Sequence, residues 1–124
     1  MDRTFVGLGA ISAFLGVALG AFAAHGLRQR LAIEMLIVFE TGVRYQMYHA
    51  LATIAVGLVL SRWPSGAVVA AGWLFLAGTV IFSGSLYLLS VTGTRAFGAI
   101  TPIGGLAFLA GWLSLASGVL SASR

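Results

Sequence analysis

The sequence has 124 residues, of which 60% are hydrophobic and 8% are charged, and its mean hydropathy is +1.04. With 17 glycines as well, it is too apolar and too glycine-rich for an ordinary soluble domain. The basic residues are all arginines and lie between apolar runs rather than in one patch, which favours membrane-interface anchoring over nucleic-acid binding. The absence of cysteine excludes disulfides, thiol catalysis and cysteine-ligated metal clusters.

Residues 5–24 form the first apolar stretch, which is long enough to cross a hydrocarbon core of about 30 Å. Its end, Ala21-Phe22-Ala23, also has the small-residue pattern of a signal-peptide cleavage site. We expect the stretch to be retained as a transmembrane helix. The short charged head, Asp2 and Arg3, then favours a cytoplasmic N-terminus.

Residues 25–42 mix charged and apolar side chains, and this pattern predicts a short interfacial helix that leads into a second span at 43–60. An ordinary polar loop is the alternative for this segment. Glu40 and Arg44 are four residues apart with the acid first, the favourable order for an intrahelical ion pair. We therefore expect the helix to begin before the membrane and to continue through Leu60.

Two further apolar stretches follow, at 67–89 and 97–120. A turn at 61–66 contains Pro64 and Gly66, and a polar loop at 90–95 precedes the last span, where Pro102 is expected in or just before the first turn. Four spans place both termini on the same side of the membrane. The prediction is an all-α membrane protein, an antiparallel bundle of four transmembrane helices that forms one domain over 1–124.

Small residues recur at intervals of seven in each predicted span. In lipid, helices associate by close backbone approach, and a seven-residue stripe predicts a left-handed bundle. Gly16 and Gly20 also form a GxxxG pair, for which a dimer contact is the alternative use. The glycines predicted to pack helices are Gly9, Gly16, Gly20, Gly57, Gly84, Gly104, Gly111 and Gly118. In the third span the predicted stripe is Ala70, Ala77 and Gly84.

Polar residues gather at the end of the bundle that holds the first and third connections, above all between Glu40 and Ala50. Ionisable groups in membrane spans are costly and mark candidate sites, whereas the alternative is a charge-neutralised helix entry with an interfacial aromatic belt. We call this candidate partner-, ligand- or lipid-binding surface the polar face. Its predicted members are His25, Glu40, Arg44, Tyr45, Gln46, Tyr48, His49, Tyr87 and Thr101.

The polar residues allow several chemical interpretations. His49 is the deepest titratable group, and with Glu40 nearby it fits a proton relay or, as we prefer, a hydrogen-bonded packing role. His25 and His49 lie at similar predicted depth, as bis-histidine haem ligation would require, but without a third ligand motif we expect no metal or cofactor. Thr79, Ser83, Tyr87 and Ser90 form a polar stripe that favours interhelical hydrogen bonds over a transport path.

Four segments together resemble the bacterial domain-of-unknown-function 423 family, which is related to a small human mitochondrial transmembrane protein. They are Ala21 to Leu27, Thr41 to Leu51, Phe82 to Leu88 and Gly98 to Gly105. Ala23, where the family often has glycine, is a departure that stays small. The resemblance covers essentially the whole chain and implies a four-helix inner-membrane protein, but it implies no activity.

No Ser-His-Asp order, P-loop or zinc-protease motif is present, so we predict no catalytic residue and no enzymatic activity. The expected function is that of a non-enzymatic accessory subunit or scaffold of a membrane complex in the bacterial inner membrane. The alternatives are a small transporter or channel component and, third, an enzyme acting on lipid or quinone. The expected partners are membrane lipids and either a second membrane protein or further copies of the chain.

Overall fold

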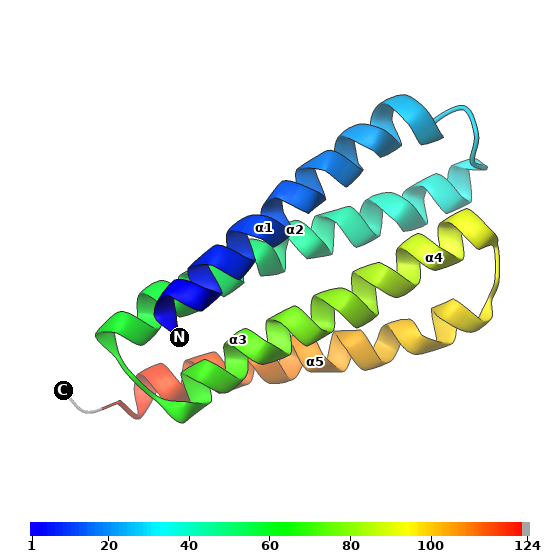
Figure 1. Cartoon of the computed structure of the whole chain (residues 1–124). Coiled ribbons are helices and arrows are strands. Elements are labelled where there is room, and N and C mark those ends of the chain that lie inside the picture. The colour runs from blue at the N-terminus through cyan, green and yellow to red at the C-terminus, as the bar shows by residue number, and fades with distance from the viewer. Residues whose placement is uncertain (123–124) are drawn as a thin grey trace.

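The computed structural model describes residues 1–122, and its regular elements are all helical. The elements are α1 (Asp2–Phe22), η1 (Ala23–Leu27), α2 (Ile33–Arg62), α3 (Gly66–Gly78), η2 (Thr79–Ser83), α4 (Gly84–Thr92) and α5 (Ala96–Leu120). The π-helical turns η1 and η2 continue their neighbours, so the chain forms four rods, α1–η1, α2, α3–η2–α4 and α5, that run alternately in opposite directions (Figure 1). The all-α fold class is confirmed.

Both predicted turns between the later rods are present, and local chemistry explains them. At the first, Pro64 follows the extended Trp63, and the Ser65 hydroxyl accepts a hydrogen bond from the Ala67 N–H at 3.1 Å, capping α3. At the second, Gly93 ends α4 with a φ of 71°, a left-handed conformation that glycine adopts without steric cost. Pro102 lies within α5, slightly deeper than expected.

Residues 25–42 do not form the separate interfacial helix that we expected. Residues 23–27 prolong α1 as the π-helical turn η1, and α2 is already helical from Ile33. Ala23, Leu27 and Phe39 form a buried cluster at this end, which explains why both parts join the long rods instead of lying on the surface. The expectation that the second helix begins before position 43 and continues through Leu60 is confirmed.

Three of the four rods are long and apolar enough to cross a membrane: Asp2–Leu27, Gly66–Thr92 and Ala96–Leu120. The remaining rod, α2, has 30 residues and ample length, but its charged and polar residues lower its hydropathy. The structure thus supports three of the four expected spans by length and composition.

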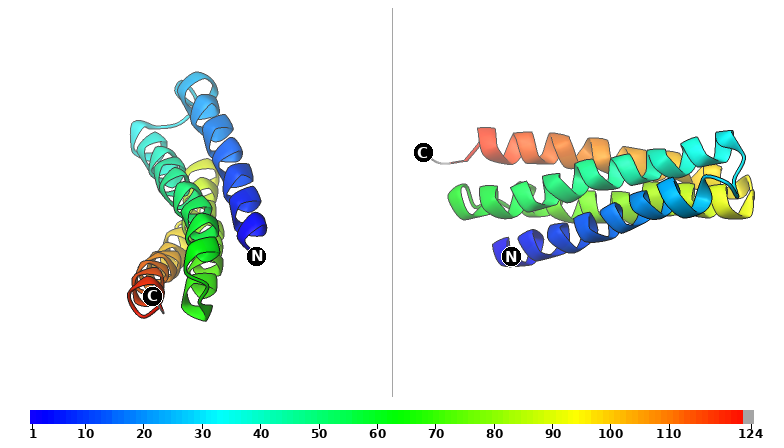
Figure 2. Two further views of the ribbon diagram at one scale, coloured as in Figure 1. Left: turned by 90° about the vertical axis from the view of Figure 1, so that its left-hand side faces the viewer. Right: turned by 90° about the horizontal axis from the view of Figure 1, so that it is seen from above.

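The rods pack mainly with their neighbours in the chain. α1 lies chiefly against α2, and α5 lies chiefly against α3 and η2, while α2 joins the two halves through α3, η2 and α4. The rods run lengthwise past one another, with the connections gathered at the two ends (Figure 2). The N-terminus, the α2–α3 turn and the end of α5 lie at one end, and the η1–α2 and α4–α5 connections lie at the other (Figure 1).

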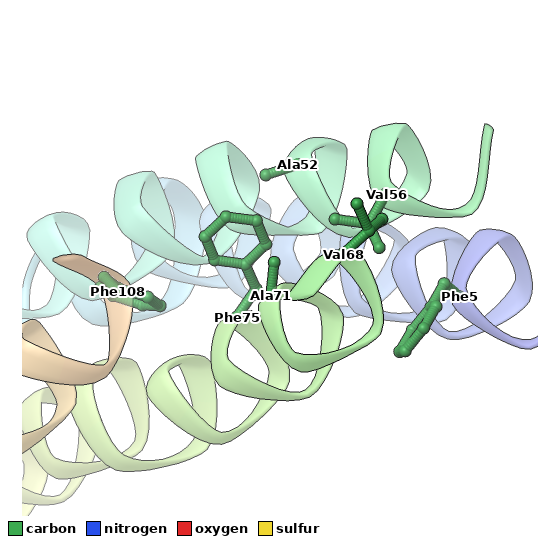
Figure 3. Close-up of a cluster of buried hydrophobic side chains, with 7 residues drawn as sticks. All are labelled: Phe5, Ala52, Val56, Val68, Ala71, Phe75 and Phe108. Atoms are coloured by element: carbon green, nitrogen blue, oxygen red, sulfur yellow. The ribbon is translucent and has the colours of Figure 1, made fainter. Parts of the chain in front are cut away.

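A buried apolar cluster draws on all four rods (Figure 3). Its members are Phe5, Ala52, Val56, Val68, Ala71, Phe75 and Phe108. Phe5, Val56, Val68 and Phe75 are fully buried. Tight dispersion contacts of this kind hold helices together in lipid, where apolar residues gain little by leaving the solvent.

Most of the predicted packing glycines lie where a side chain would collide with a neighbouring helix. A Cβ on Gly9 would lie 2.7 Å from the Ala50 carbonyl oxygen, and one on Gly104 would lie 2.7 Å from the Phe82 Cα. A Cβ on Gly57 would meet the Asp2 carbonyl oxygen at 2.6 Å. Gly16, Gly111 and Gly118 are likewise buried against side chains, and Gly20 approaches α2 less closely.

The predicted stripe of the third span is displaced by one residue. A Cβ on Gly84 would have no neighbour within 4 Å, and Ala70 and Ala77 are exposed. Seven-residue spacing instead places Ala71, Gly78 and Ser85 on the buried side. One residue rotates the stripe by about 100°, enough to exchange the lipid and protein sides.

The GxxxG pair also serves the fold itself, because both glycines face α2. A Cβ on Gly16 would lie 2.6 Å from the Met47 sulfur, and one on Gly20 would lie 3.3 Å from Val43. Three glycines outside the predicted stripes make equally close approaches: Gly42 to Tyr87, Gly72 to Phe5 and Gly78 to Phe108. Helix packing therefore uses more glycines than a single stripe in each rod.

Candidate functional site

The polar residues of α2 divide between its inner and outer sides. Gln46, His49 and Thr53 are buried, while Glu40, Arg44 and Tyr48 are exposed. The predicted polar face is therefore not one surface but an inner group that contacts other helices and an outer group that is open. Helical periodicity alone accounts for this division, because the two groups lie on different sides of the helix.

His49 is held between its own helix and α5. Its Nδ1 lies 2.8 Å from the Tyr45 carbonyl oxygen, and its Nε2 accepts a hydrogen bond from the Trp112 indole N–H at 3.1 Å. An indole N–H is only a donor, so Nε2 must be unprotonated, and Nδ1 carries the proton that it donates to Tyr45. Both ring nitrogens of a neutral imidazole are thus satisfied.

Aromatic rings complete the surroundings of His49. The ring of Phe108 stacks on the imidazole with centroids 3.5 Å apart, and Phe75 and Trp112 approach it at 5.4 and 5.8 Å. Tyr45 packs beside them against Phe82. A groove of about 530 Å³ between α2 and α5 runs past this cluster, although the side chain of His49 itself is only 4% exposed. This arrangement supports a packing histidine.

Gln46 links three rods. Its Nε2 donates to the Ser12 carbonyl oxygen on α1 at 2.9 Å, and its Oε1 accepts from the Tyr87 hydroxyl on α4 at 2.6 Å. Tyr87 in turn packs against Phe39 with ring centroids 4.8 Å apart. A largely apolar groove of about 580 Å³ between α1 and the third rod passes over this bond. The bonds of Gln46 join α1, α2 and α4 at defined positions, which apolar contacts alone would not specify.

Further polar contacts join the rods. Ser83 donates to the Gly42 carbonyl oxygen at 2.7 Å, Ser114 donates to the Ala67 carbonyl oxygen at 2.7 Å, and the hydroxyls of Ser85 and Thr101 are 2.6 Å apart. The predicted stripe in the third rod therefore does form interhelical bonds through Ser83 and Tyr87. Thr79 and Ser90, in contrast, bond to carbonyls of their own helix.

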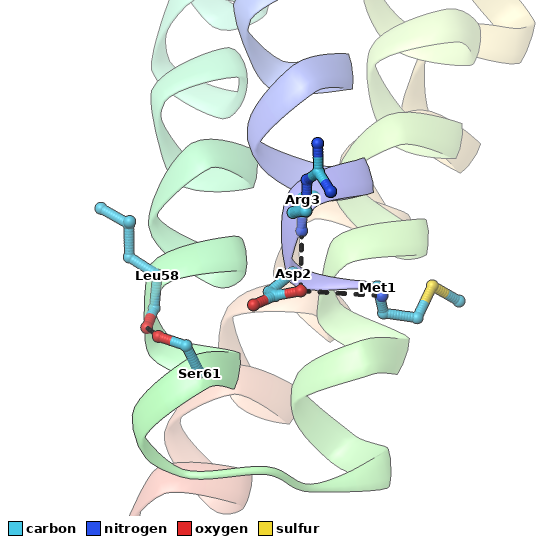
Figure 4. Close-up of polar contacts among 5 residues, drawn as sticks. All are labelled: Met1, Asp2, Arg3, Leu58 and Ser61. Carbon is cyan, nitrogen blue, oxygen red and sulfur yellow. Dashed lines mark hydrogen bonds and ion pairs between the residues drawn. The ribbon is translucent and has the colours of Figure 1, made fainter.

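The predicted ion pair between Glu40 and Arg44 is absent from the part of the chain that the structure describes. Within residues 1–122 the one ion pair joins the amino group of Met1 to the Asp2 carboxylate at 3.9 Å, at the opposite end of the bundle (Figure 4). Glu40 and Arg44 are both exposed on α2. An ion pair in solvent gains little, because two long side chains must be held in one geometry. The helix entry is thus not neutralised by this pair.

The expectation that His25 and His49 lie at similar depth is wrong. His25 is exposed in η1, and its Nδ1 lies 2.9 Å from the Ala21 carbonyl oxygen. The bond from Gln46 to Ser12 sets that part of α2 level with Ser12, so His25 is about 20 Å farther along the rod at about 1.5 Å per residue. Two such histidines cannot ligate one haem iron.

Within the described residues, no group of three histidine, cysteine, aspartate or glutamate side chains could hold a metal ion. Trp112, the partner of His49 on α5, is a residue that the sequence analysis did not single out. Its distance of 63 positions from His49 leaves no local signal. The backbone partners Ser12 and Gly42 are equally invisible to motif analysis, because any residue type offers a carbonyl.

Long apolar rods, glycine contacts and internally paired polar side chains define a helical membrane protein. Comparison of the sequence with known families agrees: residues 19–105 match the family described as "Protein of unknown function (DUF423)". The chain belongs to this family, which confirms the resemblance noted from its four segments.

Named relatives are similar over nearly their whole length. UPF0382 membrane protein YwdK of Bacillus subtilis is 50% identical over 114 residues, covering 91% of this chain and 93% of the relative. A UPF0382 membrane protein of Staphylococcus haemolyticus is 51% identical, with coverage of 91% and 92%, and one of Haemophilus influenzae is 45% identical, with coverage of 95% and 94%. No solved structure matches the chain.

Proposed function

We propose that this chain is a non-enzymatic accessory subunit or scaffold of a complex in the bacterial inner membrane. The observation that carries the proposal is the division of its polar groups. Gln46, His49 and Tyr87 are engaged in bonds between the protein's own helices, whereas Glu40 and Arg44 are exposed near one end. Deep polar groups that hold the helices suit a structural role, and open charges suit recognition of a partner or of lipid headgroups.

The proposal includes α2 as a fourth span and residues 1–124 as a single transmembrane domain. The 30 residues of α2 extend about 45 Å, and between positions 43 and 60 only Arg44 is charged. Its buried Gln46 and His49 are hydrogen-bonded, which removes most of the cost of placing them in hydrocarbon. Both termini then lie on one side, and the head of the chain favours the cytoplasm.

The absence of cysteine allows a direct test of this topology. Gln29→Cys and Thr94→Cys place single thiols in the two connections at one end, and Ser61→Cys places one near the other end. In sealed membranes, an impermeant maleimide should label positions 29 and 94 from the same side and position 61 from the opposite side. Labelling of 29 and 61 from one side would contradict the crossing of α2.

The accessory role predicts a stable partner of a different sequence. A photoreactive amino acid at Tyr48, whose side chain is 53% exposed, should crosslink a discrete second protein in native membranes. The same group at Leu113, 73% exposed on α5, is the control for random lipid-phase collisions. Native mass spectrometry should show the same heteromer. A homo-oligomer alone would contradict the accessory role and favour the transporter alternative.

A further inference from the structure

A pocket of about 500 Å³ lies at the end of the bundle where η1 connects to α2. Arg28 contributes to it from the connection, and Glu40 contributes from α2. Leu31, Ile33, Leu36 and Ile37 supply an apolar lining between them. The pocket also touches Ala24, the last residue of the first apolar stretch, so it lies where the hydrocarbon core would give way to headgroups.

The two charges in this pocket do not neutralise each other. Within residues 1–122, neither Arg28 nor Glu40 has an ion-pair partner or a side-chain hydrogen bond. Both are exposed, and both line the same space. A ligand that carries both a negative and a positive group complements such a pocket better than one with a single charge.

We infer that the pocket binds the headgroup of an amine-bearing zwitterionic phospholipid, for which phosphatidylethanolamine is the model. The phosphate would face Arg28, whose guanidinium donates several hydrogen bonds to phosphate oxygens. The primary ammonium would donate to the Glu40 carboxylate. The leucines and isoleucines would contact the glycerol region and the start of the acyl chains. This inference rests on the proposed function in one respect, namely that α1 and α2 both cross the membrane.

Other headgroups fit these groups less well. Phosphatidylglycerol offers a phosphate to Arg28 but no cation to Glu40, because its terminal glycerol is neutral and its hydroxyls form weaker hydrogen bonds to that carboxylate than an ammonium does. Phosphatidylcholine carries a cation, but its quaternary nitrogen has no N–H to donate. The arrangement therefore predicts the order phosphatidylethanolamine, then phosphatidylcholine, then phosphatidylglycerol, with Glu40 responsible for the difference between the first and the last.

The test is competitive lipid binding to the purified full chain, measured by native mass spectrometry with equimolar lipids of matched acyl chains. The wild-type chain should retain phosphatidylethanolamine about two- to fivefold over phosphatidylglycerol, the range that an exposed charge pair supplies. Glu40→Gln should abolish this preference while binding of phosphatidylglycerol persists. Arg28→Gln should weaken both lipids.

Two neighbours give matched controls. Glu34→Gln removes an exposed acid from the first turn of α2, and Arg30→Gln removes an exposed arginine from the same connection, yet neither residue lines the pocket. Both variants should keep the wild-type preference. Circular dichroism melting verifies that all four variants fold.

The inference is wrong if Glu40→Gln behaves like Glu34→Gln, or if the wild-type chain shows no preference among the lipids. The competition is performed on the isolated chain, so its result does not depend on a protein partner. A heteromer that persists while lipid preference is absent would overturn the lipid site and leave the accessory role standing. Lipid preference without a heteromer would overturn the accessory role and leave the lipid site standing.

Discussion

Trp112 on α5 donates its indole hydrogen to Nε2 of His49 on α2, and this single contact determines which imidazole nitrogen carries the proton. The other nitrogen then has one available role, which is donation to the Tyr45 carbonyl oxygen. A histidine held in this way is a neutral link between two helices. It has no spare lone pair for a metal and no spare hydrogen for a relay.

Trp112→Phe should lower the free energy of unfolding in detergent by about 1–3 kcal/mol, because Nε2 of His49 loses its donor while the aromatic ring is largely kept. Trp73→Phe is the matched control, since both tryptophans are 45% exposed and Trp73 contacts Phe5 only through its ring. Thermal melting followed by circular dichroism compares them. Equal losses would show that the indole bond does not contribute.

Gln46 and Tyr87 should be energetically coupled. Tyr87→Phe leaves Oε1 of Gln46 without its donor, and Gln46→Leu leaves the Tyr87 hydroxyl without its acceptor. The losses of unfolding free energy in the two single variants should therefore add up to more than the loss in the double variant. Coupling of about 0.6–1.7 kcal/mol is expected for such a bond in a membrane protein. Unfolding of the four proteins in a double-mutant cycle measures it, and additivity would contradict the interhelical bond.

Gly104→Ala should destabilise the bundle by about 1–3 kcal/mol, because its Cβ would lie 2.7 Å from the Phe82 Cα and backbone cannot move aside cheaply. Gly84→Ala, in the adjacent rod, meets nothing within 4 Å and should leave stability unchanged or raise it by up to about 1 kcal/mol through helix propensity. Thermal midpoints in one detergent decide between them. A loss at Gly84 similar to that at Gly104 would place α4 in a different rotation.

Glu40 and Arg44 should behave independently. Since no ion pair joins them, Glu40→Gln and Arg44→Gln should each change the free energy of unfolding by no more than about 0.5 kcal/mol, and their effects should add. Melting of the two single variants and the double variant tests this. A double variant more stable than the sum of the singles would restore the pair that the helical spacing had suggested.

Much of the architecture follows from the sequence by itself. Apolar length predicted three spans, Pro64 marked the α2–α3 turn, the polar segment at 90–95 marked the α4–α5 connection, and the glycines at 9, 16 and 104 signalled close helix contacts. These features are local, because they depend on the hydropathy, ring geometry or side-chain size of individual residues. Helical periodicity also separates Glu40 and Arg44 from Gln46 and His49 around α2, although only the structure shows which of the two sides is buried.

The tertiary structure alone decided what each polar residue contacts. Helical spacing placed Glu40 beside Arg44 but could not show that exposure leaves them apart, and it placed His49 inward without revealing Trp112. The stripe in the third rod was displaced by one position because periodicity gives the spacing of a face and not its rotation toward a neighbour. Pairing between rods depends on how they are rotated and shifted along one another, and this arises from contacts between residues far apart in the chain.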